Sequence, residues 1–163
     1  MIPDKAFYVN PHNVNGSTFQ LDKAESNHAT RVLRLKKGDE ICLLDGVGIG
    51  YHAKIKSIEN NISGTIEESI PDLGENKYSV NLASALIKRD RFELLLEKAT
   101  EFGVNEIQPL MLERCVKKTM NFERSQKIVI SSAKQCCRSR FPVLHEPMDM
   151  KKILKNSDGQ FIS

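Results

Sequence analysis

The spacing of apolar residues changes character about halfway along the chain. In the first 70 positions, short apolar or alternating stretches are separated by turn-forming residues, which predicts strands over 5–10, 40–46, 48–61 and 60–70. A helix is predicted over 22–35, where Asp22 is a plausible N-cap and apolar residues recur at helical spacing. Several short strands with one short helix favour a small β-barrel.

The second half alternates between strand and helix patterns. Apolar runs predict strands at 78–87, 104–112 and 142–147, and helices are predicted over 89–103, 121–139 and 149–157. The clearest helix is 89–103, whose apolar stripe comprises Phe92, Leu95, Leu96, Ala99 and Phe102, with Gly103 at the C′ position. This rhythm implies a parallel sheet with right-handed crossovers.

These patterns predict an α/β fold class with an N-terminal β-barrel. The polar, Pro- and Gly-containing stretch 71–77 is the best domain boundary, so we expect domains at 1–72 and 73–163. Residues 159–163 look like the beginning of another strand, and a parallel sheet usually needs more strands than these to cover both of its faces. We therefore expect 73–163 to be the first part of a longer α/β domain.

Composition narrows the class of protein. The chain is 40% apolar and 28% charged, which is typical of a soluble globular protein. No apolar run approaches the roughly 18 residues that span a bilayer, and the N-terminus lacks the features of a secretory signal. We therefore expect no membrane association, a cytoplasmic location and free thiols at all four cysteines.

Charge is distributed unevenly. Residues 1–72 contain 8 basic and 10 acidic side chains, whereas 73–163 contain 16 and 11. Between 114 and 140 there are eight basic residues and one acid, Glu123. Such a segment could bind an anionic partner, with nucleic acid as the leading candidate, or could simply be a solvated helix face.

Few residues suggest chemistry by themselves. Parallel strands would place Lys88 and Arg114 near one rim of the sheet, where ligands collect, although Lys88 could equally be a solvated residue before a helix. The glycines of 46–50 lie between two strands and predict a hairpin turn, not a phosphate-binding loop. Cys136 and Cys137 are adjacent, a spacing that suits neither zinc nor a redox pair, so we interpret them as small buried hydrophobes and expect no metal.

Three segments together carry a family resemblance. They are 28–48 ("HATRVLRLKKGDEICLLDGVG"), 85–118, which contains "KATEFGV", and 131–147 ("SSAKQCCRSRFPVLHEP"). In this order they resemble the RsmE family, the bacterial ribosomal RNA uridine-N3 methyltransferases. The family's "EQS-x-R" is "KQCCR" here, so lysine replaces the acid and Cys136 replaces serine.

The resemblance implies a fold and an activity. The family joins a PUA-like RNA-binding barrel to a SPOUT-type α/β knot that binds S-adenosylmethionine. It works as a homodimer on N3 of a uridine in small-subunit ribosomal RNA, so ribosomal RNA or the small ribosomal subunit is the expected partner. The family's knot segments, including its "GPEGG" loop, have no counterpart before Ser163. We therefore expect the cofactor-binding residues to lie beyond Ser163 and residues 1–163 alone to be inactive.

The resemblance and the charge pattern together give candidate site residues. Arg114 and Arg138 are predicted to be catalytic, because a cation could stabilise the uracil anion that forms when N3 loses its proton. The predicted RNA-binding residues are Arg31, Arg34, Lys36, Lys37, Lys88, Arg91, Lys117, Lys118, Gln135 and Arg140. Two alternatives remain open: a non-catalytic PUA-like RNA-binding module, and an α/β scaffold protein with a basic helix.

Overall fold

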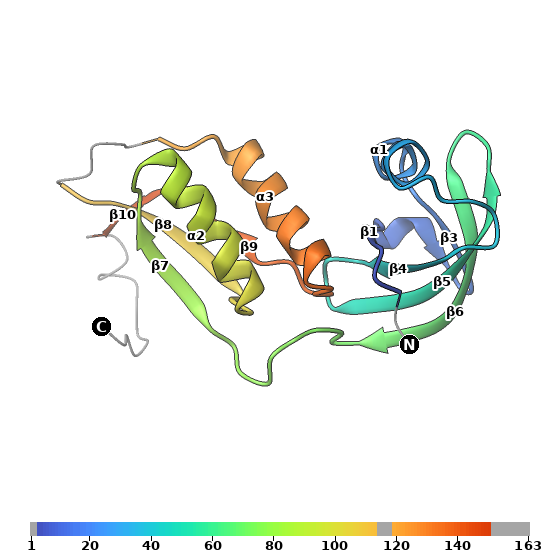
Figure 1. The fold of residues 1–163 in the computed structure, drawn as a ribbon. Coiled ribbons are helices and arrows are strands. Elements are labelled where there is room, and N and C mark those ends of the chain that lie inside the picture. Colours follow the sequence, from blue (N-terminus) through green and yellow to red (C-terminus); the bar gives the residue numbers. More distant parts are fainter. Residues whose placement is uncertain (1–2, 114–118, 151–163) are drawn as a thin grey trace. The chain divides into compact units, whose positions relative to one another are not determined.

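A computed structural model describes residues 3–113 and 119–150 of the chain (Figure 1). Its residues form two compact units. We call the first the barrel unit, which comprises Met1–Lys77 and Ile130–Phe141, and the second the sheet unit, which comprises Tyr78–Val129 and Pro142–Ser163. Helix α3 (Phe122–Gln135) therefore contributes its first half to the sheet unit and its second half to the barrel unit.

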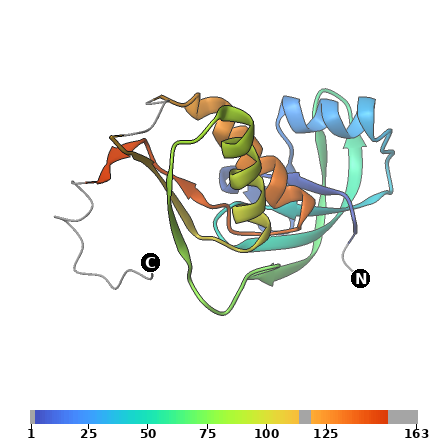
Figure 2. The same ribbon diagram turned by 60° about the vertical axis from the view of Figure 1, so that its left-hand side comes forward.

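The barrel unit contains a six-stranded sheet in the order β1-β4-β5-β6-β3-β2. The strands are β1 (Ala6–Tyr8), β2 (Val14–Asn15), β3 (Thr18–Gln20), β4 (Glu40–Leu44), β5 (Ile49–Ile58) and β6 (Ile62–Pro71). Neighbours pair antiparallel except β1 and β4, which are parallel. The long β5–β6 pair changes register at His52/Ala53 and again at Ile55/Ser57, and such irregularities bend a sheet. The curled half-barrel that results is visible in both ribbon views (Figures 1 and 2).

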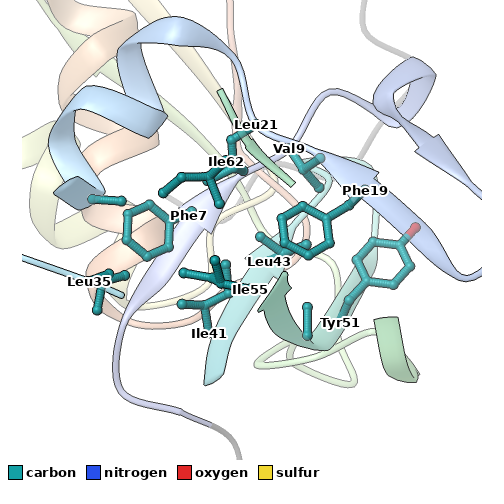
Figure 3. Close-up of a cluster of buried hydrophobic side chains, with 12 residues drawn as sticks. Phe7, Val9, Phe19, Leu21, Leu35, Ile41, Leu43, Tyr51, Ile55 and Ile62 are labelled. Atoms are coloured by element: carbon teal, nitrogen blue, oxygen red, sulfur yellow. The ribbon is translucent and has the colours of Figure 1, made fainter. Parts of the chain in front are cut away.

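The core of the barrel unit is formed by inward-facing residues of these strands (Figure 3). Among its fully buried members are Phe7, Ile41, Leu43, Ile55 and Ile62. β4 is buried on both faces, because Cys42 and Leu44 are also inaccessible to solvent. This explains why its sequence is continuously apolar and does not alternate.

The helical segment of the barrel unit differs from the prediction. Asp22 is the N-cap, as predicted, and its side chain accepts the N–H of Glu25 at 2.8 Å. However, α1 covers only Lys23–Asn27, and His28–Val32 continues as a π-helical turn, η2. Another short turn, η1, spans Pro11–Asn13. The chain leaves the helical path at Arg34, whose φ of 53° lies in the left-handed region.

The sheet unit is a parallel sheet covered by helices, as predicted. Its strands are β7 (Asn81–Ala85), β8 (Glu106–Met111), β9 (Val143–Leu144) and β10 (Met148–Asp149). β8 is central, pairing with β7 on one side and, at different points along its length, with β9 and β10. Within the strand predicted over 142–147, only Val143–Leu144 is extended as β9. β10 follows at Met148–Asp149 and so overlaps the first residue of the helix predicted over 149–157. The strand predicted at 159–163, and nearly all of the helix predicted at 149–157, lie outside the described residues.

Helix α2 (Arg89–Glu101) lies beside the first half of α3 in both views (Figures 1 and 2). Phe92, Leu96 and Ala99 of the predicted stripe are buried in a core with Ile107 of β8. Phe102 is 78% exposed, so its place in the stripe was wrong. The reason is that α2 ends there: Phe102 is the C-cap and Gly103 turns the chain at a φ of 87°.

No helix within the described residues has the length and apolarity needed to cross a membrane.

Candidate functional site

The sheet unit contains a pocket of about 360 Å³ where β7 ends and where both α2 and α3 begin. We call it the α2–α3 pocket. It is lined by Leu86, Ile87, Arg89, Phe92, Glu93, Thr119, Met120, Asn121, Arg124 and Ser125. Ligands of open α/β sheets collect beyond the carboxyl ends of strands, which is where this pocket lies.

Local sequence explains how the pocket is built. Leu86 donates its backbone N–H to the carbonyl of Leu110 at 2.9 Å, which extends the β7–β8 pairing to the pocket floor. Lys88 is the N-cap of α2, but its side chain makes no capping hydrogen bond. Asn121 does cap α3, because its side-chain oxygen accepts the N–H of Arg124 at 2.9 Å. The two helices therefore present their partially positive ends to the pocket.

Two arginines share one carboxylate at this pocket. Glu93 Oε1 lies 3.3 Å from Arg89 Nε and 2.7 Å from Arg124 Nε, and Glu93 Oε2 accepts a second bond from Arg124 at 3.0 Å. The hydrogen bond to Glu93 raises the pKa of the Arg124 guanidinium above its usual value, so this side chain stays charged. The residues that line the pocket carry two cations and one anion, and the exposed carboxylate of Asp90 lies 3.9 Å from Arg89 Nε and offsets part of this charge. The apolar walls of the pocket could contact a flat organic group.

Lys88, which was predicted for this rim, and Arg91, which was predicted to bind RNA, are exposed at the first turn of α2. Arg114, Lys117 and Lys118 lie outside the described residues. Sequence reasoning missed the shared contact of Arg89, Glu93 and Arg124. The spacing of Arg89 and Glu93 on one helix face was an available signal, whereas Arg124 lies 31 residues beyond Glu93 and no local pattern links them.

The end of α3 lies in the barrel unit, where Arg138 is buried. Only 2% of its side chain is exposed, and its guanidinium donates to Glu75 Oε2 at 2.8 Å. The other carboxylate oxygen, Glu75 Oε1, accepts the backbone N–H of Arg140 at 2.8 Å. Arg138 is therefore held as an anchor between α3 and the segment that contains Glu75, and it could reach RNA only if this ion pair opened. The prediction that Arg138 is catalytic stays a prediction.

Gln135 and Arg140, which were predicted to bind RNA, are more accessible to solvent than Arg138. Gln135 is exposed. Arg140 is half-exposed, with its guanidinium 3.0 Å from Asp72. Counting charges over 114–140 overstated the free positive charge, because each of the five described basic residues there contacts a carboxylate. These residues are Arg124, Lys127, Lys134, Arg138 and Arg140.

The cysteines behave as apolar residues. Burial and the neighbouring Cys137 thiol raise the pKa of Cys42 to about 12. Burial also raises the pKa values of Cys136 and Cys137, so all three remain protonated thiols near neutral pH. Cys136 donates its S–H to the carbonyl of Ser132 at 3.1 Å within α3. Cys42 is buried, but Cys136 and Cys137 are only partly buried, so the interpretation of the adjacent pair as buried hydrophobes holds only in part. Cys115 lies outside the described residues.

The predicted RNA-binding residues of the barrel unit are clustered. Arg31, Arg34, Lys36 and Lys37 all lie on η2 or the turn that follows it, and all are exposed. Asp39 shapes this turn by accepting the backbone N–H of Lys36 at 2.8 Å. Within the described residues none of these four basic side chains forms an ion pair, so their charges remain available for phosphate groups.

Comparisons with known proteins agree with this architecture. Residues 21–68 match a family model described as RNA methyltransferase PUA domain, and residues 74–162 match one described as RNA methyltransferase domain. The chain is 31% identical to ribosomal RNA small subunit methyltransferase E of Synechocystis sp., over 93% of this chain and 50% of that protein. It is 30% identical to the enzyme of the same name from Rickettsia conorii, over 93% of this chain and 63% of that protein.

A solved structure has the same fold. The ribosomal RNA small subunit methyltransferase E of Neisseria gonorrhoeae, bound to S-adenosyl methionine, superposes with a TM-score of 0.85 at 28% identity, covering 96% of this chain and 66% of that one. This chain thus spans between one half and two thirds of the length of these relatives. The fold class and the family resemblance predicted from the sequence are confirmed. The chain belongs to the RNA methyltransferase family of the ribosomal RNA small subunit methyltransferase E type, and it carries the PUA domain of that family.

Proposed function

We propose that this protein methylates N3 of a uridine in small-subunit ribosomal RNA, with S-adenosylmethionine as the methyl donor. The α2–α3 pocket carries this proposal, because it joins a positive charge to apolar walls at the carboxyl end of β7 in the methyltransferase domain. The names of the curated relatives support a ribosomal RNA substrate. The choice of uridine N3 rests on the family resemblance.

The pocket supplies two things that this reaction needs. N3 of uracil lies on the base-pairing edge, so the base must leave its stack before it can react. The apolar side chains of Leu86, Ile87 and Phe92 could contact the face of the displaced base. When N3 loses its proton, charge moves onto the flanking carbonyl oxygens, and a fixed guanidinium stabilises that charge. We assign this role to Arg89 or Arg124, while the predicted role of Arg114 stays a prediction.

The described residues do not fit the methyl donor itself. S-adenosylmethionine carries a sulfonium cation, and the α2–α3 pocket has two arginines against one glutamate. Like charges repel, so we place no part of the donor in this pocket and assign no described residue to hold it.

The test is methyl transfer by the complete purified protein to small ribosomal subunits that lack the modification. We expect the digested RNA to contain 3-methyluridine by mass spectrometry. Arg124→Gln is expected to lower kcat/KM by about 100-fold, the usual effect of losing one charge-stabilising donor. Lys127→Gln is the matched control, because it removes one positive charge from the same helix at a residue that is 73% exposed and that, among the described residues, pairs only with Glu123. It should leave the rate unchanged.

The assay also separates the alternatives. A methylated nucleoside other than 3-methyluridine would refute the choice of N3. RNA binding without any methyl transfer would favour a non-catalytic RNA-binding module. Equal rates for Arg124→Gln and Lys127→Gln would refute the assignment of the pocket.

Assembly and location form part of the same proposal. We expect the protein to be a homodimer, as the family resemblance implies. We also expect it in the cytoplasm, because an enzyme that modifies ribosomal RNA must reach ribosomes. Light scattering of the complete protein, read as molar mass, checks the first expectation, and cell fractionation checks the second. A monomer that is fully active would contradict the dimer.

A further inference from the structure

The barrel unit has a cavity that the proposed reaction does not use. It is a groove of about 450 Å³ over β3 and β6, which we call the β3–β6 groove. It is lined by Asn13, Asn15, Thr18, Phe19, Gln20, Lys56, Ser63, Gly64 and Thr65. Phe19 is in the core and is only 3% exposed, so Thr18 and Gln20 on either side of it face outward.

The walls of the groove are fixed by strand register. Thr18 lies directly opposite Thr65, and Gln20 lies opposite Ser63, so these four side chains share one face of the sheet. Thr18 is held further by a hydrogen bond from its hydroxyl to the carbonyl of Asn15 at 2.9 Å. A Cβ at position 64 would overlap the carbonyl oxygen of Lys54, so glycine there allows the close approach of β6 to β5 beneath the groove.

The chemistry of the groove is polar but nearly uncharged. Six of its nine residues carry an amide or a hydroxyl, Lys56 is the only charged one, and none is acidic. This absence of acids occurs within a segment, 1–72, that has more acidic than basic residues. Within residues 3–113 and 119–150, the side chains of Asn13, Asn15, Gln20, Ser63 and Thr65 make no hydrogen bond. Each amide or hydroxyl can therefore both donate and accept toward a partner.

These features distinguish between forms of RNA. Proteins usually hold unpaired bases by stacking them on exposed aromatic rings, and the one aromatic residue of the groove is buried in the core. Helical RNA is instead recognised across its wide, shallow minor groove through 2′-hydroxyls and phosphates. A 2′-hydroxyl donates and accepts, as do the groove's amides and hydroxyls, and Lys56 could neutralise a phosphate.

We propose that the β3–β6 groove binds the minor-groove side of an A-form RNA helix through 2′-hydroxyl groups. The proposal rests on the proposed function in one respect, because it takes RNA to be the substrate. It adds that the barrel unit recognises a helical segment that need not contain the methylated base.

The test measures binding of the complete protein to a short RNA duplex, to a DNA duplex of the same sequence and to one RNA strand of that duplex. We expect wild type to prefer the RNA duplex. The double variant Gln20→Ala/Thr65→Val should bind the RNA duplex about tenfold more weakly, since about two hydrogen bonds are lost, with little change for DNA. Gln126→Ala, at an exposed amide on α3, is the control and should bind both duplexes as wild type does.

Three results would overturn the proposal. The first is a wild-type protein that binds both duplexes equally, and the second is a double variant that keeps its preference for RNA. The third is a double variant that loses affinity only for single-stranded RNA, which would make the groove a site for unpaired nucleotides. The substituted side chains are at the surface, so urea unfolding should confirm an intact fold. Because the preference for RNA over DNA duplex is measured without methyl transfer, the binding result could be interpreted even if the proposed reaction were not observed.

Discussion

Replacing Arg138 by methionine is expected to destabilise the barrel unit strongly. The side chains of Arg138 and Glu75 are only 2% and 7% exposed, and they meet at 2.8 Å. Methionine keeps much of the apolar stem but has no charge, so it would leave the Glu75 carboxylate buried without its cation. Removing one partner of a buried ion pair typically costs about 3–5 kcal/mol, because the remaining charge is neither paired nor hydrated.

The matched control is Arg140→Met. The Arg140 side chain pairs with Asp72 at 3.0 Å, but 49% and 67% of these two side chains are exposed. Exposed pairs contribute about 0–1 kcal/mol. The backbone N–H of Arg140 would still donate to Glu75, so this variant isolates the exposed ion pair. A third variant, Arg138→Met/Glu75→Leu, removes both buried charges and should recover much of the loss.

The assay is urea unfolding followed by circular dichroism. A domain is stable by about 5–15 kcal/mol, so the loss expected for Arg138→Met is a large fraction of the total and should move the midpoint clearly. If Arg138→Met lost no more stability than Arg140→Met, the anchoring role would be refuted. If it stayed fully stable and yet abolished methyl transfer, the catalytic prediction for Arg138 would be supported instead.

Three further substitutions or treatments test the barrel unit. Asp45→Ala should lower the free energy of unfolding in urea by about 2–4 kcal/mol, because Oδ1 of this buried residue accepts three backbone N–H groups of the following turn. Asp39→Ala removes the acceptor of one backbone N–H group and should lower it by about 1 kcal/mol. Gly64→Ala should cost more than Gly16→Ala, because a Cβ at 64 overlaps backbone, whereas one at 16 meets nothing within 4 Å and costs only the strain of a φ of 57°. A thermal midpoint for Gly64→Ala no lower than that for Gly16→Ala would contradict the close approach. Iodoacetamide at pH 8 should leave Cys42 unmodified until urea is added, because a pKa of about 12 keeps the Cys42 thiol protonated. Rapid labelling of Cys42 in the native protein, measured by mass spectrometry, would disprove the burial of this residue.

The elements that the sequence predicted well are those with strong local signals. The stripe of α2 and its terminal glycine determined that helix almost to the residue, because periodicity and a C′ glycine are properties of neighbouring positions. The hairpin turn predicted at the glycines of 46–50 is confirmed, since Gly46 and Gly48 lie between the antiparallel strands β4 and β5, and Gly50 is the second residue of β5. The π-helical turn at His28–Val32 was not foreseen, because helical spacing of apolar residues does not distinguish between types of helix.

The candidate site was harder to predict because its contacts join distant residues. Glu75 and Arg138 are separated by 63 positions, and the charge of Arg138 was counted toward a basic face before its partner was known. The end of α3 shows the same limitation for backbone geometry. Cys137 has a φ of 54°, and its N–H bonds to Lys134 while that of Arg138 bonds to Ala133, which is the arrangement that usually requires glycine at C′.

Ion pairing determines which basic residues are available to bind RNA phosphates. A count of charge along the sequence treats every lysine and arginine alike, but a guanidinium held by a buried carboxylate gives little to a phosphate. In the described part of 114–140 every basic residue contacts a carboxylate, and for Arg124, Lys134 and Arg138 that carboxylate is largely buried. Arg31, Arg34, Lys36, Lys37, Lys88 and Arg91, in contrast, form no ion pair within the described residues. These six were predicted from the family resemblance and the charge pattern, and they keep their charge for a ligand. The electrostatic part of RNA binding should therefore come from the turn after η2 and the first turn of α2, while the basic end of α3 holds the barrel unit together.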